Sequence, residues 1–379
     1  MSRLNKLIQD LMPNGIKFEP LAKLIQLNSG ERITKLHNAG SLYPVYGGGG
    51  ESFRTDEFNR QNEYVISRFA MSKECVRKVN GKFWLLDSGF TFNPLNNSIS
   101  KDYIAYWLLN SQDRIFSCTS QGAQKNLNTK GFLAFRVPVP PLRIQEEIVR
   151  ILDSFTSLEA ELETELGARQ KQYEYYRNRL LTFQELDHSR INDLIRELCP
   201  GGIVYKPLSN LLNYEQPTKY IVNTTDYDST PGVPVLTPGQ TFILGYTKET
   251  DNIFQADKTN PTIIFDDFTT DFKWVDFPFK VKSSAMKMLS SRGEISLRFA
   301  WYAMQTIRYI PQNHARQWIK NYSAFEIPVP PMPVQNKIVG ILDIFTSLKA
   351  ELEAGLEARR KQYEYYRDRL LTFKELDHE

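Results

Sequence analysis

Apolar residues recur every three or four positions along one long stretch in each half of the chain. The first stretch runs from about residue 144 to residue 183 and contains no proline and one glycine. This spacing places the apolar side chains on one stripe of a helix, and about 40 helical residues span roughly 60 Å. The two stripes are Ile148, Ile151, Phe155, Leu158, Leu162, Leu166, Tyr173, Tyr176, Leu180 and Phe183, and then Ile338, Ile341, Phe345, Leu348, Leu352, Leu356, Tyr363, Tyr366, Leu370 and Phe373.

The two stretches belong to a duplicated frame. Residues 138–188 align with residues 328–378 without a gap, with 37 identities in 51 positions, and residues 2–21 align with residues 189–208. The segments between them, residues 22–137 and 209–327, show almost no resemblance to each other. The chain is therefore expected to fold as two pseudo-symmetric halves in which similar frames enclose two unlike inserts.

A lone helix of this length would leave its apolar stripe in water, so the two copies are expected to cover each other as an antiparallel coiled coil. The alternative is that each helix packs on its own insert. We assign the coiled-coil and partner contacts to Ile148, Phe155, Leu162, Tyr173, Leu180, Ile338, Phe345, Leu352, Tyr363 and Leu370.

The inserts show the alternating and mixed patterns of α/β domains. Strands are expected at residues 63–69, 82–87, 233–237, 241–246, 261–265 and 272–281, and helices at residues 101–110 and 297–307. The sequence PVPP at residues 138–141 and 328–331 provides a stiff lead-in to each long helix. The predicted fold class is α+β, with a first globular domain at residues 1–137, a central helix at 138–188, a second globular domain at 189–327 and a C-terminal helix at 328–379.

Charge is distributed unevenly over these segments. The chain of 379 residues has a net charge of +3, but residues 1–137 carry 18 Lys and Arg against 11 Asp and Glu. In the second insert the positive residues cluster at Lys280, Lys282 and Lys287. A basic first insert beside acidic helices favours DNA-contacting modules on a protein-docking spacer, although the second insert is near neutral overall. Three widely spaced cysteines, with no apolar run of membrane-spanning length and no signal peptide, predict a cytoplasmic protein.

These features resemble the specificity subunit of a type I restriction–modification system. The resemblance is carried by RVPVPPLRIQEEIVRILDSF at residues 136–155 and EIPVPPMPVQNKIVGILDIF at residues 326–345, and by the order insert, helix, insert, helix. It implies that each insert is a target recognition domain reading one half of a bipartite, asymmetric DNA target. It also implies that the helices set the spacing and dock two methyltransferase subunits, joined for cleavage by restriction subunits that also translocate DNA. The resemblance also implies a bacterial or archaeal source. The partner subunits, rather than this chain, would bind S-adenosylmethionine, ATP and Mg²⁺.

Motifs of catalysis are absent from the sequence or too weak to predict it. An adenine methyltransferase needs an Asn/Asp-Pro-Pro-aromatic loop, and the sequence FNPLNN at residues 92–97 lacks the second proline. The run Gly47 to Gly50 lacks cofactor-loop spacing and is interpreted as a flexible hairpin tip. The nuclease-like pair Asp271 and Lys273 is a short pattern that recurs by chance. We therefore expect no catalytic, cofactor-binding or metal-binding residues in this chain.

Direct DNA contacts need Lys, Arg, Ser, Thr, Gln or Asn side chains near phosphates and base edges. In the first insert we select Ser52, Arg54, Arg68, Lys73, Lys78, Gln121, Gln124, Lys125 and Asn126. In the second insert we select Gln240, Lys248, Thr269, Thr270, Lys273, Lys282, Ser283, Ser284, Lys287 and Arg316. The alternative function is a non-catalytic, two-headed scaffold whose inserts bind proteins.

Overall fold

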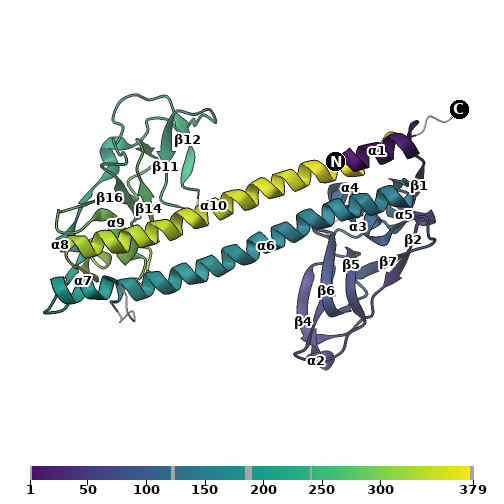
Figure 1. Cartoon of the computed structure of the whole chain (residues 1–379), viewed down its shortest axis with the longest axis horizontal. Helices are drawn as coiled ribbons and strands as arrows, with labels where there is room; N and C mark the ends of the chain where they lie inside the picture. The colour runs from purple at the N-terminus through teal and green to yellow at the C-terminus, as the bar shows by residue number, and fades with distance from the viewer. Residues whose placement is uncertain (1, 121–123, 184–189, 240, 376–379) are drawn as a thin grey trace. The chain divides into compact units, whose positions relative to one another are not determined.

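The structure is a computed structural model that describes residues 2–120, 124–183, 190–239 and 241–375. Its contacts divide the chain into two compact units, one formed by residues 1–163 with 354–379 and the other by residues 164–353. The long helices α6 (Leu142–Leu181) and α10 (Met332–Leu371) each contribute one part to each unit (Figure 1). Each unit therefore contains one insert and parts of both frame copies. The domain boundaries predicted from sequence instead treat each long helix as a segment of its own, and these boundaries remain a prediction.

The first unit is built around a six-stranded sheet in the order β2-β7-β5-β6-β3-β4. All pairs in it are antiparallel except β3 with β6. A separate pair, β1 with β8, joins the opening segment to the lead-in of α6. The strands are β1 (Phe18–Pro20), β2 (Ile25–Ser29), β3 (Tyr43–Gly47), β4 (Gly50–Thr55), β5 (Arg60–Ser67), β6 (Val76–Leu85), β7 (Gly89–Pro94) and β8 (Arg136–Pro138). The helices are α1 (Ser2–Leu11), η1 (Leu21–Lys23), α2 (Lys35–Asn38), α3 (Lys101–Asn110), α4 (Gln112–Ser117) and α5 (Thr129–Leu133).

The second unit has the same strand order in two smaller sheets, β10-β16-β13-β14 and β12-β11-β15. The pair β9 with β17 takes the place of β1 with β8. Its strands are β9 (Tyr205–Pro207), β10 (Leu212–Glu215), β11 (Val233–Leu236), β12 (Ile243–Thr247), β13 (Thr262–Asp266), β14 (Phe272–Val275), β15 (Lys280–Val281), β16 (Met286–Ser291) and β17 (Glu326–Pro328). Its helices are α7 (Arg190–Leu198), α8 (Leu208–Leu211), η2 (Pro217–Tyr220), α9 (Leu297–Met304) and η3 (Tyr322–Ala324).

One strand expected from sequence, residues 272–281, is divided into β14 and β15. Its first part pairs with β13, and its second part pairs in parallel with β11. Pro278 lies between them, and a proline cannot donate a ladder hydrogen bond. In the first unit the corresponding strand β6 is continuous and contacts both β5 and β3.

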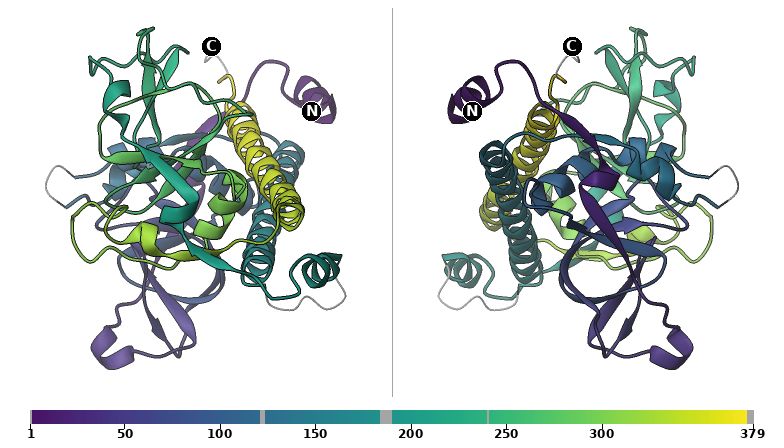
Figure 2. Two further views of the ribbon diagram at one scale, coloured as in Figure 1. Left: turned by 90° about the vertical axis from the view of Figure 1, so that its left-hand side faces the viewer. Right: turned by 90° about the vertical axis from the view of Figure 1, so that its right-hand side faces the viewer.

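The two long helices pack antiparallel in both units, as predicted. In the first unit Phe155 of α6 stacks on Tyr366 of α10, with ring centroids 5.5 Å apart. In the second unit Tyr176 of α6 stacks on Phe345 of α10 at 5.6 Å. An early residue of one helix thus meets a late residue of the other in each unit, and Figure 2 shows the two helices side by side.

The helices also enter the cores of the inserts, so the two packing modes considered from sequence coexist. Ile148 and Leu370 lie in the first core, and Leu180 and Ile338 lie in the second. The other predicted stripe contacts, Phe155, Leu162, Tyr173, Phe345, Leu352 and Tyr363, are half-buried. Leu158 departs from the predicted stripe, because 42% of its surface is exposed.

Candidate nucleic-acid interface

Each insert is fixed to the start of its long helix by one buried glutamine. In the first unit the Gln145 side chain accepts a hydrogen bond from the Ser100 amide at 2.8 Å and donates to the Pro140 carbonyl at 2.7 Å. In the second, Gln335 accepts from the Ser296 amide at 2.8 Å and donates to the Pro330 carbonyl at 2.8 Å. An unpaired amide in these buried sites would be costly, so each glutamine fixes how its insert meets the frame.

A second joint repeats between the insert helices and the frame. The Tyr106 hydroxyl of α3 donates to Asp153 at 2.5 Å, and the Tyr302 hydroxyl of α9 donates to Asp343 at 2.6 Å. Burial raises the pKa of both tyrosines well above the ordinary value, and the bonds to the carboxylates raise it further. The sequence contains the signal: ISKDYIAY at residues 99–106 parallels ISLRFAWY at residues 295–302. These two segments share only three identities, which is too few to set them apart from the unlike sequences around them.

The loop between β5 and β6 in the first unit is held against the segment that precedes α5. The Met71 amide donates to the Lys125 carbonyl, and the Leu127 amide donates to the Arg68 carbonyl, each at 2.9 Å. Ala70, in this loop, has a φ of 48°. This left-handed conformation is strained for a residue with a Cβ, and such strain gathers at functional sites.

The β13–β14 loop in the second unit occupies the same place in the strand order and is anchored by Asp267. The Gln317 amide donates to the Asp267 carbonyl at 2.8 Å, and the Trp318 amide donates to its carboxylate at 2.9 Å. Thr270 in this loop has a φ of 65°, an outlier for a β-branched residue. Two inserts with almost no sequence resemblance thus each join a strained hairpin loop to a polar segment near the end of the insert.

Several of the residues predicted to contact DNA lie on these paired loops. The bond from the Asp267 amide to the Ala285 carbonyl brings the segment after β15 beside the second loop. The paired loops carry Arg68, Lys73, Gln124, Lys125 and Asn126 in the first unit and Thr269, Thr270, Ser283, Ser284 and Arg316 in the second. Two of these have internal partners: Thr270 is buried and its hydroxyl donates to the Thr269 carbonyl at 2.6 Å, and the Arg316 guanidinium lies 3.9 Å from the Asp267 carboxylate. We define these two groups as the first and second loop surfaces.

Other predicted contacts lie outside the loop surfaces or have internal partners. Arg54 in β4 donates to the carbonyls of Ser41 and Leu42, and Lys248 pairs with Asp228 at 2.7 Å, a hydrogen bond that raises the pKa of this lysine. Ser52, Lys78, Lys273 and Lys282 have exposed side chains on or near β4, β6, β14 and β15. Gln121 and Gln240 lie outside the described residues.

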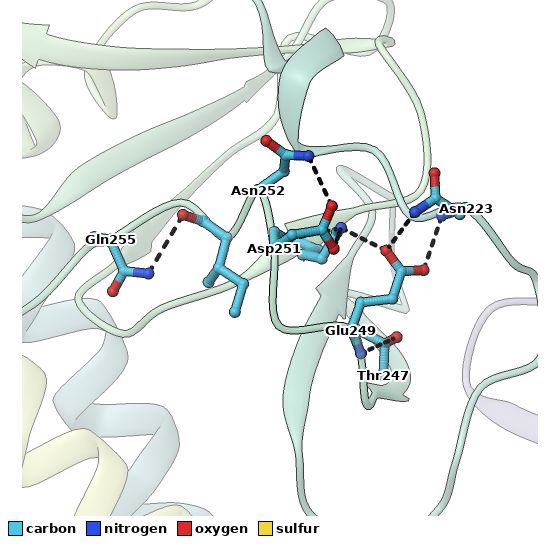
Figure 3. Close-up of polar contacts among 8 residues, drawn as sticks. Asn223, Thr247, Glu249, Asp251, Asn252 and Gln255 are labelled. Carbon is cyan, nitrogen blue, oxygen red and sulfur yellow. Dashed lines mark hydrogen bonds and ion pairs between the residues drawn. The ribbon is translucent and has the colours of Figure 1, made fainter.

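The lysine cluster of the second insert is not the exposed patch that the sequence indicated. Lys287 is completely buried and its ammonium lies 3.1 Å from the Asp267 carboxylate, an ion pair whose angles fall outside hydrogen-bond geometry. Lys280 is also buried and donates to Glu249 at 2.5 Å. Figure 3 shows how Glu249 also accepts from the amide and side chain of Asn223. Two of the three cations therefore stabilise the insert internally, and Lys282 alone of the three is exposed.

The glycine run at the β3–β4 turn forms a hairpin tip, but its Gly48 carbonyl is held from two sides. It accepts hydrogen bonds from the Ser67 hydroxyl at 2.7 Å and from the Arg77 guanidinium at 3.0 Å. A Cβ on Gly48 would lie 2.1 Å from the Phe69 carbonyl oxygen, so only glycine fits there. The turn packs onto the first residues of the β5–β6 loop and supports it.

Among the described residues, no three His, Cys, Asp or Glu side chains lie together as a metal site. Cys75 is buried, and burial raises the pKa of its thiol to about 11, which disfavours the reactive thiolate. None of the described helices combines the length and apolarity needed to cross a membrane. The chemistry that the loop surfaces offer is hydrogen bonding and cationic contact with a polar, anionic ligand.

Comparisons with known proteins agree with this geometry. The model of the type I restriction modification DNA specificity domain matches residues 13–169 and again residues 200–359. The specificity subunit of the Escherichia coli type I restriction enzyme EcoR124I/EcoR124II is 52% identical over 184 residues, which cover 46% of this chain and 45% of that protein. A putative type I specificity subunit of Mycoplasma pneumoniae is 24% identical over 377 residues, covering 94% of this chain and 98% of that protein.

A solved structure has the same fold. It is the S subunit of a type I restriction–modification system from M. genitalium, with a TM-score of 0.69 and 17% identity over 95% of this chain and 98% of that chain.

Proposed function

The chain belongs to the type I restriction–modification DNA specificity family, and from this premise we propose that it is the sequence-specific DNA-binding subunit of such a complex. The observation that supports this most directly is the pairing of like folds with unlike sequences. The two inserts share a strand order, yet their loop surfaces present different side chains. Each insert then reads one half of a bipartite, asymmetric target.

The duplicated frame accounts for assembly in this proposal. Tyr175 and Tyr365 occupy equivalent positions on the two helices and are 54% and 59% exposed. Two equivalent exposed surfaces suit two copies of one partner, here the methyltransferase subunit, with restriction/translocase subunits joining for cleavage. The chain itself is proposed to be non-catalytic and cytoplasmic, and its partners are proposed to bind S-adenosylmethionine, ATP and Mg²⁺.

An insert exchange tests the division of roles. Residues 22–137 are replaced by the equivalent insert of a related subunit, which must supply its own counterparts of Ser100 and Tyr106 at the joints. Methylated adenines are then mapped by sequencing in a host that also expresses the methyltransferase subunit. We expect one half of the target to change while the other half and the spacing persist. A change in both halves, or methylation by the isolated chain, would contradict the proposal.

Helix length tests the spacing role. Seven residues are inserted after Gly167 and seven after Ala354, which adds about 10 Å to each helix and keeps the heptad phase. Since B-DNA rises about 3.4 Å per base pair, the gap between half-sites should grow by roughly three base pairs. An unchanged gap in a folded, methylating complex would exclude the helices as the spacing element.

A further inference from the structure

A pocket of about 510 Å³ in the second unit has a chemistry that DNA reading by the loop surfaces does not explain. One wall is the β13–β14 loop with Thr270 and Asp271, and a second wall is α9 and the residues after it. The third wall is made by the long helices. Its polar lining includes Arg177, Asp271, Gln305 and Lys349.

The pocket offers flat apolar faces together with cations. Tyr173, Trp301, Tyr309 and Phe345 supply aromatic surface, and Arg177 and Lys349 supply two positive charges against the single acid Asp271. The buried indole N–H of Trp301 has no hydrogen-bond partner among the described residues. A buried donor without a partner is uncommon in folded proteins, and a ligand acceptor that displaces neighbouring side chains would satisfy it. Aromatic faces beside cations suit a planar ring that carries a negative group.

The duplicated frame provides an internal reference for this chemistry. Trp301, Gln305 and Lys349 align with Ala105, Leu109 and Glu159 in the first half. In the first unit Glu159 accepts from Arg360 at 2.6 Å, and the residue that aligns with Arg360 is Gln170, which belongs to the second unit. The ion pair between Glu159 and Arg360 of the two helices thus has no counterpart at the pocket. Lys349 stands there instead, and its ammonium lies 3.7 Å from the Glu353 carboxylate. The first unit has the same strand order with Ala105, Leu109 and Glu159 at these three positions.

We propose that this pocket binds a nucleoside 5′-phosphate, with the base against the aromatic walls and the phosphate near Arg177 and Lys349. The Gln305 side-chain oxygen already accepts from the Tyr173 hydroxyl at 2.8 Å and from the Arg177 guanidinium at 3.4 Å. Its amide nitrogen has no hydrogen-bond partner among the described residues and could donate to a base edge. The volume lies within the range of small-molecule sites, roughly 300–1,000 Å³. The nucleotide has two sources, a free mononucleotide or a nucleotide extruded from bound DNA, and the second source rests on the proposed DNA-binding function.

The first experiment titrates AMP into the full chain by calorimetry. The pocket residues are substituted by the residues that the first half of the chain has at the aligned positions. Lys349→Glu, Gln305→Leu and Trp301→Ala each install the residue that the first half has at the aligned position. Lys349→Glu should weaken AMP binding by about tenfold or more, as expected for loss of a charge-assisted contact. Glu159→Lys in the first unit is the matched control and should leave AMP binding unchanged.

The second experiment places 2-aminopurine at each position of the cognate duplex. A fluorescence rise on complex formation, lost in Trp301→Ala while the affinity for the duplex persists, identifies an extruded nucleotide as the source. AMP binding without that rise identifies free nucleotide. The proposal is overturned if neither signal is found, if inorganic phosphate binds as tightly as AMP, or if Lys349→Glu leaves both signals intact. Specific binding of the unmodified duplex is measured separately, so a failed pocket is distinguishable from a failed DNA-binding function.

Discussion

The two inserts achieve the same strand order with different polar chemistry. In the first unit the side chains that hold the turn beneath the β5–β6 loop bond to a backbone carbonyl: Ser67 and Arg77 both donate to the Gly48 carbonyl. In the second unit the support is ionic, because Asp267 and Lys287 are both fully buried and Glu249 pairs with buried Lys280. The fold therefore does not depend on one set of polar anchors.

The joints to the frame show the opposite behaviour. Gln145 and Gln335 make matching bonds, and so do Tyr106 and Tyr302 with their aspartates. Side chains that attach the insert are retained, while side chains that shape its loops differ. This contrast separates the parts of the molecule that specify assembly from the parts that are free to specify a ligand.

The largest effect is expected where the units differ most, at the buried ion pair. Lys287→Met leaves the buried Asp267 carboxylate with the Arg316 guanidinium, 3.9 Å away and half-exposed, as its remaining counter-charge, which should destabilise the second unit by about 3–5 kcal/mol. Lys287→Met combined with Asp267→Asn should recover most of this loss, since no buried charge remains and the side-chain oxygen still accepts from Trp318. Urea unfolding, with hydrogen exchange to locate the change, measures both.

The exposed Lys273→Met is the control for this pair and should change stability little. Equal losses in the single and the double variant would show that packing, rather than charge pairing, dominates at this site.

An intermediate effect is expected at the conserved joints. Tyr106→Phe removes a buried hydrogen bond to a carboxylate and should cost about 1.5–3 kcal/mol. Tyr302→Phe should cost less, because Asp343 retains the Arg298 guanidinium at 2.8 Å. The exposed Tyr175→Phe is the control, and unfolding in urea is the measurement. A larger loss at Tyr302 than at Tyr106 would contradict this ranking.

Acid should weaken the second unit through the pair of Glu249 with buried Lys280. The hydrogen bond from Lys280 holds the pKa of Glu249 below its ordinary value of 4.5. The pair therefore stabilises the second unit fully above pH 4.5, and this stability is lost as the pH falls through the lowered pKa. Glu249→Gln should reduce the acid sensitivity of the second unit, as followed by hydrogen exchange between pH 5 and about pH 3.

Glu357→Gln is the comparison for the acid series. The pKa of Glu357 is also lowered, by the hydrogen bond from Lys361, but this pair is exposed and should be screened by salt. If both variants respond equally at high salt, burial does not protect the Glu249 pair.

The sequence predicted the elements whose signal is local or repeated. The long helices follow from apolar spacing, and α3 has the bounds predicted for it at residues 101–110. The structure adds its N-cap, because the Ser100 hydroxyl accepts from the Tyr103 amide. The antiparallel pairing of the helices followed from the duplication.

The misinterpreted features depend on distant contacts. Lys280 and Lys287 look like solvent-exposed lysines in sequence, and only the approach of residues 249 and 267 shows that they are buried. The break in the 272–281 strand depends on which neighbour each half pairs with. The pocket beside Lys349 is assembled from three segments far apart in the chain, so no local pattern indicates it.

The smallest effect on stability is expected at the strained loop residues, Ala70 and Thr270. The same residues should have the most specific effect on recognition of the DNA target. Left-handed backbone costs a residue with a Cβ about 1–2 kcal/mol, while glycine regains unfolded-chain entropy of about 0.4–1 kcal/mol. Ala70→Gly and Thr270→Gly should therefore change the free energy of unfolding by no more than about 1 kcal/mol each. The loops lose conformational restriction, so binding to the cognate half-site should weaken several-fold while salt-sensitive, non-specific binding persists.

Asn62→Gly, at a φ of 52° outside the loop surfaces, is the matched control and should leave discrimination between half-sites intact. Binding is measured with duplexes altered in one half-site at a time. Ala70→Gly should relax one half only and Thr270→Gly the other, because each loop belongs to one insert. Unchanged discrimination in both variants would show that the strained loops do not read the target.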